Sequence, residues 1–299
     1  MDAPRAALGS TPVSVRARAR PLRASTLARA VALYGVLVVS LVLTALPFLW
    51  MIAGSFKTND DFFSHPGTLI PSAPTTQNYV DLLNGSSIPF LHQFANSLIV
   101  AVATTLISLA VCSLTGYGFA KFEFRFKRLL FVLVLATLMV PAQVTLVPLF
   151  LLMHTLGWLD TLQGVTAPGI FTALGVFLMR QTMLSVPNEL LDAARIDGAS
   201  ELRLFWRVAL PLARAGLSVL AILVFLQAWN DFLWPVIVLQ TDTNMTVAVG
   251  LSNLVGLYKV NYGMIDAGAF LVTLPIIVAF LALRNQFLSG LTAGALKGA

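Results

Sequence analysis

The sequence predicts an all-α protein that crosses a membrane with six helices. Hydrophobic residues make up 58% of the 299 residues and charged residues only 11%, whereas soluble domains are roughly 25% charged. The apolar residues gather in runs close to or above the ~20 residues that a helix needs to cross a bilayer. These runs predict spans at residues 30–56, 95–115, 129–153, 162–179, 215–239 and 267–283.

The first span follows an arginine-rich tail at residues 1–29, whose composition predicts disorder. The run 30–56 carries no charge and is too long for the core of a signal peptide, so we expect it to be retained. Residues 57–94 are polar and contain four prolines, which predicts a loop with a few ordered turns. The other five helices form a transmembrane domain over residues 95–284, and a tail at 285–299 ends the chain.

Two of the later spans carry residues that interrupt a regular helix. Pro141 and Pro148 are expected to bend the third span or to leave backbone carbonyls free. Asp231 places a charge within the fifth span.

The distribution of charge orients the chain in the membrane. All but two of the 19 Lys and Arg residues lie in the two tails and in the loops after the second and fourth spans; the exceptions are Lys57 and Lys259. The positive-inside rule therefore places both tails and the loop after the fourth span in the cytoplasm, and residues 57–94 outside.

The loop at residues 180–214 is the most charged stretch of the chain. It predicts two short helices that meet at Gly198, a residue suited to the left-handed conformation that ends a helix. We expect Ser185 to cap the first helix, Pro187 to lie in its first turn and Pro211 to stop the second. By these criteria alone, the loop could also be an amphipathic connector that lies on the lipid headgroups.

The spacing within this loop resembles the EAA motif of ABC importer permeases. Asp192-Ala193-Ala194 is followed after three residues by Gly198, then after nine by Val208, and after one by Leu210-Pro211. Asp192 and Val208 stand where the family usually has Glu and Ile. The resemblance implies that residues 185–211 form a coupling helix that docks on a cytoplasmic ATPase. The residues it assigns to ATPase coupling are Glu189, Asp192, Ala193, Ala194, Gly198, Leu210 and Pro211.

Two further stretches narrow the resemblance to carbohydrate permeases of the maltose-transporter type. They are residues 227–235, with the sequence Gln-Ala-Trp-Asn-Asp-Phe-Leu-Trp-Pro, and the ending at residues 284–298. The resemblance implies the type I importer fold in a bacterial inner membrane. It also implies a heterodimer with a second permease, two ATPase subunits and an extracellular solute-binding protein that delivers a sugar, often an oligosaccharide or a glycoside.

The residues that would meet a sugar are harder to identify. Trp229, Asn230 and Asp231 offer an aromatic face and polar groups within the fifth span, and we assign them to a substrate pathway or gate. For Asp231 a structural or gating role is favoured over direct sugar contact. Six polar residues of the second span are expected to bond to helix carbonyls instead: Asn96, Thr104, Thr105, Ser108, Ser113 and Thr115. In maltose-type transporters the loop before the last span reaches into the binding protein, so residues 240–265 are our candidate for docking.

Several other functions are disfavoured by the sequence. A glycine-rich phosphate loop ending in Gly-Lys-Ser/Thr is missing, so we expect no cofactor and expect ATP to be bound by the partner subunits. One cysteine and three scattered histidines do not suggest a metal site, and the basic residues follow membrane orientation rather than nucleic-acid binding. The same machinery carrying an amino acid or polyol remains an alternative. An ion-coupled carrier or an intramembrane enzyme is less well supported, since we find no repeat and no cluster of His, Cys or paired acids within the spans.

Overall fold

The computed structural model describes the backbone at residues 24–255 and 260–295, and the side chains at residues 29–255 and 260–282. The described backbone is helical and contains no strands. The chain divides into two compact units, residues 1–49 and 50–299. The first unit holds most of α1 (Ala24–Gly54), an apolar helix with Pro47 inside it. Of the predicted tail 1–29, residues 1–23 lie outside the described residues and the remainder belongs to α1.

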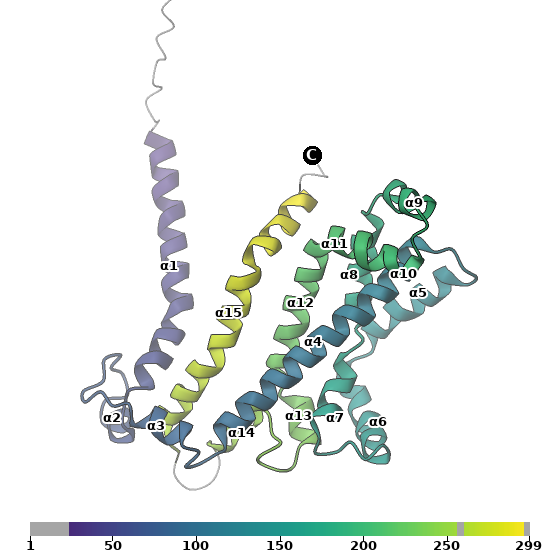
Figure 1. Ribbon diagram of the computed structural model, residues 1–299. Helices are drawn as coiled ribbons and strands as arrows, with labels where there is room; N and C mark the ends of the chain where they lie inside the picture. The colour runs from purple at the N-terminus through teal and green to yellow at the C-terminus, as the bar shows by residue number, and fades with distance from the viewer. Residues whose placement is uncertain (1–23, 256–259, 296–299) are drawn as a thin grey trace, which may run out of the picture. The chain divides into compact units, whose positions relative to one another are not determined.

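In the second unit, α4 (Phe90–Lys121) and α15 (Tyr262–Ala295) are unbroken helices of membrane-crossing length. Both are longer than the predicted spans 95–115 and 267–283, and α15 takes in most of the predicted tail 285–299. Together with three bent pairs of helices and α1, they give up to six membrane spans. Figure 1 shows α4 beside α12, with α10 near its last turn and α14 near its first.

The three remaining spans are broken. The third bends by 100° between η1 and α6, and the fourth by 48° between η2 and α8. The fifth is bent by 82° from the helical stretch Glu201–Leu212 that precedes it. The pieces of the third are α5 (Lys127–Ala136), η1 (Thr137–Met139) and α6 (Ala142–Thr155). Those of the fourth are α7 (Leu162–Thr166), η2 (Ala167–Gly169) and α8 (Ala173–Leu184). The fifth consists of α12 (Arg214–Trp229) and, after a gap at residues 230–232, α13 (Leu233–Val238).

The sequence explains where these breaks occur. Pro141 lies between η1 and α6, as predicted, whereas Pro148 lies inside α6 without interrupting it. Thr161 and Thr172 cap α7 and α8, since each hydroxyl accepts a hydrogen bond from the backbone N–H three residues later. Asp231 lies in the gap between α12 and α13 and accepts a hydrogen bond from the N–H of Trp234 at 3.5 Å.

Short helices fill the loops outside these spans. The loop after α1 contains α2 (Asn59–Ser64) and α3 (Gln77–Leu83), and the loop before α15 contains α14 (Val247–Asn253). The side chain of Lys57 is almost fully buried in the first of these loops, where its ammonium group donates a hydrogen bond to Thr68 Oγ1 at 3.1 Å. The predicted polar loop is therefore an ordered structure.

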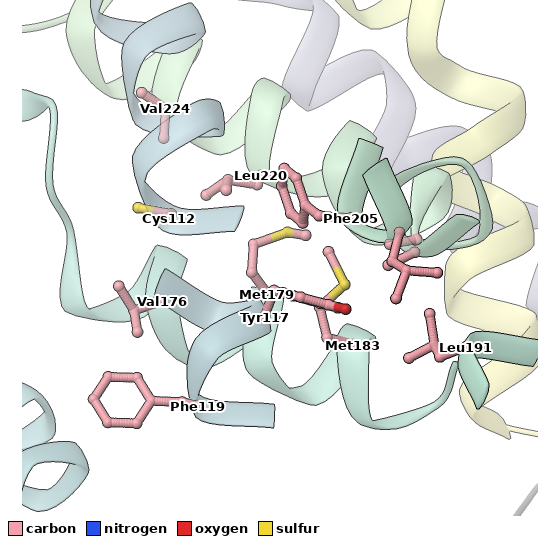
Figure 2. Packing of buried hydrophobic residues seen from close by; sticks show 13 residues of the cluster. Cys112, Tyr117, Phe119, Val176, Met179, Met183, Leu191, Phe205, Leu220 and Val224 are labelled. Atoms are coloured by element: carbon pink, nitrogen blue, oxygen red, sulfur yellow. The ribbon is translucent and has the colours of Figure 1, made fainter. Parts of the chain in front are cut away.

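The largest buried cluster lies where α4, α8 and α12 meet the charged loop. Figure 2 shows Met179, Met183 and Phe205 side by side in this cluster. The ring of Tyr117 packs on that of Phe205 with 5.3 Å between centroids. The approach of α4 to α8 depends on Gly116, because a Cβ at this position would lie 2.7 Å from Met179 Cβ.

Candidate functional site: the charged loop and a cavity among the broken spans

The first helix of the charged loop is α9 (Asn188–Ile196), and it ends as the sequence predicts. Gly198 has φ +80°. Its N–H donates to the carbonyl of Arg195 at 3.0 Å, and the N–H of Ala199 donates to that of Ala194 at 3.0 Å. This pair of bonds is a Schellman motif, which favours glycine at the left-handed position.

The start of α9 differs from the prediction. Pro187 precedes the helix as its N-terminal cap residue, and Ser185 is the C-terminal cap of α8. The hydroxyl of Ser185 donates to the carbonyl of Thr182 at 2.7 Å. Ser185 therefore ends one helix rather than starting the next, because α8 extends to Leu184, beyond the predicted end of its span at residue 179.

The second predicted helix does not stop at Pro211. It is built from α10 (Glu201–Leu204), the π-helical turn η3 (Phe205–Ala209) and α11 (Leu210–Leu212), and the chain turns after Ala213. In η3 the N–H of Leu210 reaches the carbonyl of Phe205, one residue further back than in an α-helix. This widened turn lies directly before Pro211, which has no N–H to continue the α-helical ladder.

Two carboxylates of the charged loop pair with Arg195. Its guanidinium donates to Asp192 Oδ1 at 2.6 Å and to Glu201 Oε1 and Oε2 at 2.7 and 3.2 Å. These bonds raise the pKa of Arg195, and the hydrogen bond from Arg195 is the main reason why the pKa of Glu201 is lowered. Asp192 is thus paired with a basic group of its own chain.

The other residues assigned to coupling divide between two faces of the loop. Glu189 and Ala193 are exposed, whereas Ala194 and Leu210 pack against the buried cluster. Apolar side chains also lie on the exposed face, including Ile196 with 87% of its surface exposed. Nothing within 4 Å would meet a Cβ at Gly198, so the space beside it is open.

A cavity of about 350 Å³ lies among α4, α6, η2, α12 and α13. Its polar lining residues are Thr104, Thr145, Gln227 and Asp231, and Trp234 closes one side. Thr104 is only 4% exposed, and its hydroxyl has no hydrogen-bond partner among the described residues. The cavity therefore offers hydrogen-bonding groups within an otherwise apolar lining.

Of the three residues predicted for the substrate pathway, only Asp231 lines this cavity. Trp229 is buried, donates from Nε1 to the carbonyl of Val272 at 3.1 Å, and packs on Phe225 with 5.9 Å between ring centroids. Asn230 donates to the carbonyl of Leu226 at 2.8 Å and closes the end of α12. Their side chains are engaged in packing and capping.

Sequence reasoning missed three polar lining residues, Thr104, Thr145 and Gln227. Gln227 lies in the last turn of α12, and Asp231 follows just beyond the end of this helix. Thr104 was expected to bond to a helix carbonyl, as its neighbour Thr105 does with Ala101 at 2.6 Å. Thr115 also follows the expectation, with a bond to Val111 at 2.7 Å. Only tertiary packing distinguishes Thr104 from these two.

The loop predicted to dock a binding protein is held by side chains from α4 and from residue 160. Gln93 donates to the carbonyl of Asp242 at 2.9 Å, and Asn96 to those of Thr243 and Met245 at 2.7 and 3.1 Å. The carboxylate of Asp160 accepts from the backbone of residues 240 and 241 and from the Thr241 hydroxyl. Residues 256–259 of this loop lie outside the described residues.

Comparison with known families identifies the chain. The model of the family described as binding-protein-dependent transport system inner membrane component matches residues 112–287. The chain belongs to this family. It is therefore a multi-pass inner-membrane subunit of a binding-protein-dependent transport system, and it is built as an ABC importer permease.

Curated members of the family resemble this permease over most of its length. The arabinooligosaccharide transport permease AraQ of Bacillus subtilis is 39% identical over 254 residues, 84% of this chain and 90% of the relative. The lactose permease LacG of Rhizobium radiobacter is 33% identical over 86% of this chain and 93% of its own. The sn-glycerol-3-phosphate permease UgpE of Yersinia pestis is 30% identical over 85% and 93%.

A solved structure shares the fold. A chain of a bacterial ABC transporter involved in the import of the acidic polysaccharide alginate superposes with a TM-score of 0.80 at 21% identity, covering 88% of this chain and 98% of that one. The six-span permease architecture predicted from the sequence is thereby confirmed, with three of its spans broken.

Proposed function

We propose that this permease carries an oligosaccharide or a glycoside inward across the bacterial cell membrane. The observation that carries the proposal is its similarity to AraQ and LacG, 39% and 33% identical and both named for carbohydrates, over more than four fifths of the chain. A second permease would complete the membrane part as a heterodimer. An extracellular solute-binding protein would deliver the sugar, and two cytoplasmic ATPase subunits would bind the ATP.

The charged loop supports the proposed coupling to an ATPase. Glu189, Asp192 and Asp197 give α9 an exposed acidic surface. Helices that lie on a membrane surface usually carry Lys and Arg on the polar face, whereas the Arg195 of α9 is already paired with two carboxylates. This charge favours docking on a protein over the alternative of a helix resting on lipid headgroups.

The orientation required by this function follows from the basic residues of the tails and loops, and it can be tested directly. A cysteine introduced by Ile196→Cys would lie on an exposed part of α9, while the sole native cysteine, Cys112, is fully buried. We expect a membrane-impermeant maleimide to label it in inside-out vesicles but not in intact spheroplasts. Labelling from outside would place the loop on the wrong side for an ATPase.

The cavity is the proposed part of the sugar pathway in this subunit, with Asp231 as a gating residue. Sugars need hydrogen-bonding side chains, and Thr104, Gln227 and Asp231 supply them. Among the lining residues Asp231 is the only charged one. A carboxylate repels a phosphate group, so this cavity suits a neutral sugar better than glycerol phosphate, the solute for which UgpE is named.

Uptake by the reconstituted transporter tests the proposal. Affinity purification from native membranes should recover a second permease and an ATPase, which are then placed in vesicles with the binding protein. We expect ATP-dependent uptake of a neutral sugar such as arabinotriose or lactose, and none by the Gly198→Asp variant at an equal protein level. Uptake of glycerol 3-phosphate alone would refute the assignment to sugars.

A further inference from the structure

We propose that the C-terminal end of α4 holds both ends of α9 and that α4 transmits the movement of α9 to the loop at residues 242–247. The inference rests on the proposed function, because it assumes that an ATPase moves α9. It assigns a positioning role to Lys121, Tyr117 and Glu201.

Lys121, the last residue of α4, holds the beginning of α9. Its ammonium group donates to the carbonyl of Val186 at 2.6 Å and to Asn188 Oδ1 at 2.7 Å. Asn188 is the first residue of α9. Hydrogen bonds from a charged donor are shorter and stronger than neutral ones, so this contact fixes one end of the helix to α4.

The far end of α9 is connected to α4 through Glu201. Arg195, in the last turn of α9, makes the two-bond contact with the Glu201 carboxylate described above. The hydroxyl of Tyr117 on α4 donates to Glu201 Oε2 at 3.4 Å. Tyr117 is 4% exposed and belongs to the buried cluster, so this weaker contact starts from a rigid position. Two attachment points oppose a rotation of α9 that a single point would allow.

The N-terminal end of α4 is hydrogen-bonded to the loop at residues 242–247. Gln93 and Asn96 donate to backbone carbonyls of this loop, as described above, and Ser97 Oγ accepts from the N–H of Val247 at 2.8 Å. Gln93 is fully buried. Polar side chains near each end of α4 therefore contact one of the two loops.

The shape of the spans favours α4 over the covalent neighbours of the charged loop. On one side of the loop, α12 begins at a bend of 82°, and on the other, α8 bends by 48° into η2. Bends and gaps in a helix absorb displacement. In contrast, α4 is continuous for 32 residues, or roughly 48 Å at a rise of about 1.5 Å per residue. A displacement at Lys121 is therefore carried to Gln93 by one helix.

The test uses the full complex in vesicles with a reporter cysteine introduced by Thr243→Cys, which replaces an exposed residue of the loop. The readouts are sugar uptake per ATP hydrolysed and the change in maleimide labelling of the reporter when ATP and vanadate are added. Lys121→Met and Glu201→Gln remove one attachment each. Lys121→Arg keeps the donors, and Lys127→Met is the matched control, since Lys127 pairs only with the exposed Glu123 in the adjacent loop among its described contacts.

We expect Lys121→Met and Glu201→Gln to hydrolyse ATP while uptake per ATP falls about fivefold or more, the lower end of typical coupling between sites. The labelling change at the reporter should shrink with it. Lys121→Arg and Lys127→Met should behave as the parent. If the Lys121→Met complex fails to assemble, Glu201→Gln alone provides the test. The Glu201 side chain is partly exposed, so we expect its replacement to leave assembly intact.

Unchanged stoichiometry and labelling in both variants would overturn the inference, as would a parent complex whose reporter does not respond to ATP. A parent complex that takes up no sugar but still shows the ATP-dependent labelling would refute the proposed substrate alone. The two failures are therefore distinguishable.

Discussion

The contact between α4 and α8 at Gly116 leads to a prediction about stability. A Cβ added at this position would lie 2.7 Å from Met179 Cβ and 2.8 Å from Arg180 N. The first distance is about 0.7 Å short of the 3.4 Å at which ordinary van der Waals contact begins. Backbone atoms of α8 are among the obstacles, so the two helices would have to separate. Overpacking of this kind costs roughly 1–3 kcal/mol.

A matched control lies two residues further along the same helix. A Cβ at Gly118 would meet nothing within 4 Å, so Gly118→Ala should gain up to about 1 kcal/mol of helix propensity. Gly116→Ala gains the same helix propensity, so the free energies of unfolding of the two variants should differ by the overpacking cost alone, roughly 1–3 kcal/mol. At about 2–4 °C per kcal/mol, their Tm values should be at least ~2 °C apart.

The sole cysteine of the chain provides the assay. Cys112 is fully buried in the same cluster, so a thiol-reactive dye reports unfolding of the protein in detergent during a temperature ramp. Equal Tm values for the two variants would refute the idea that Gly116 permits the close approach of these helices.

Three further predictions follow from single contacts. Gly250→Ala would place a Cβ 1.8 Å from Gln93 Oε1, so it should lower Tm in the dye assay, and Gln93→Ala in the same chain should relieve the effect. Gly198→Ala should cost about 1 kcal/mol of stability, because φ is +80° although the space is open. Burial raises the pKa of Asp160, but its hydrogen bonds with Thr241 and neighbouring groups outweigh burial and leave the pKa lowered. The Asp160 carboxylate therefore stabilises the protein above the pKa of ~4 that Asp has in the unfolded chain. At pH 7, Asp160→Asn should be less stable than the parent. This difference should vanish as the pH falls through the lower pKa that Asp160 has in the folded protein.

The features that sequence analysis predicted are those in which one residue type decides the local backbone. Gly198 takes the left-handed conformation because a glycine has no Cβ and so avoids the steric cost that this conformation has for other residues. The third span breaks at Pro141 because proline cannot continue the helix. The prediction for Pro211 was wrong because a π-turn before it lets the helix run on to Leu212. The presence of a proline in the sequence does not reveal whether the turn before it is α-helical or widens into a π-turn.

The features that could not be predicted depend on partners far away in the chain. The helix α4 extends beyond its apolar run because polar residues near its ends, Gln93 and Lys121, find acceptors in two distant loops. Thr104 and Thr105 are identical in type and adjacent, yet only Thr105 bonds to its own helix among their described contacts. Pairing of Arg195 with Glu201 crosses the turn at Gly198, which a helical spacing rule does not describe.

The position of the cavity connects these two kinds of feature. Its lining includes Ala142 directly after the break at Pro141, Gly169 at the end of η2, and Asp231 in the gap after α12. The cavity thus lies where three broken spans are interrupted. Within a bilayer, irregular backbone is tolerated only where it is buried in protein or lines a water-filled space, because lipid cannot satisfy its polar groups. The interruptions at Pro141 and Asp231, both visible in the sequence, therefore mark the polar part of the bundle, and Thr104 becomes part of it only because α4 passes beside them.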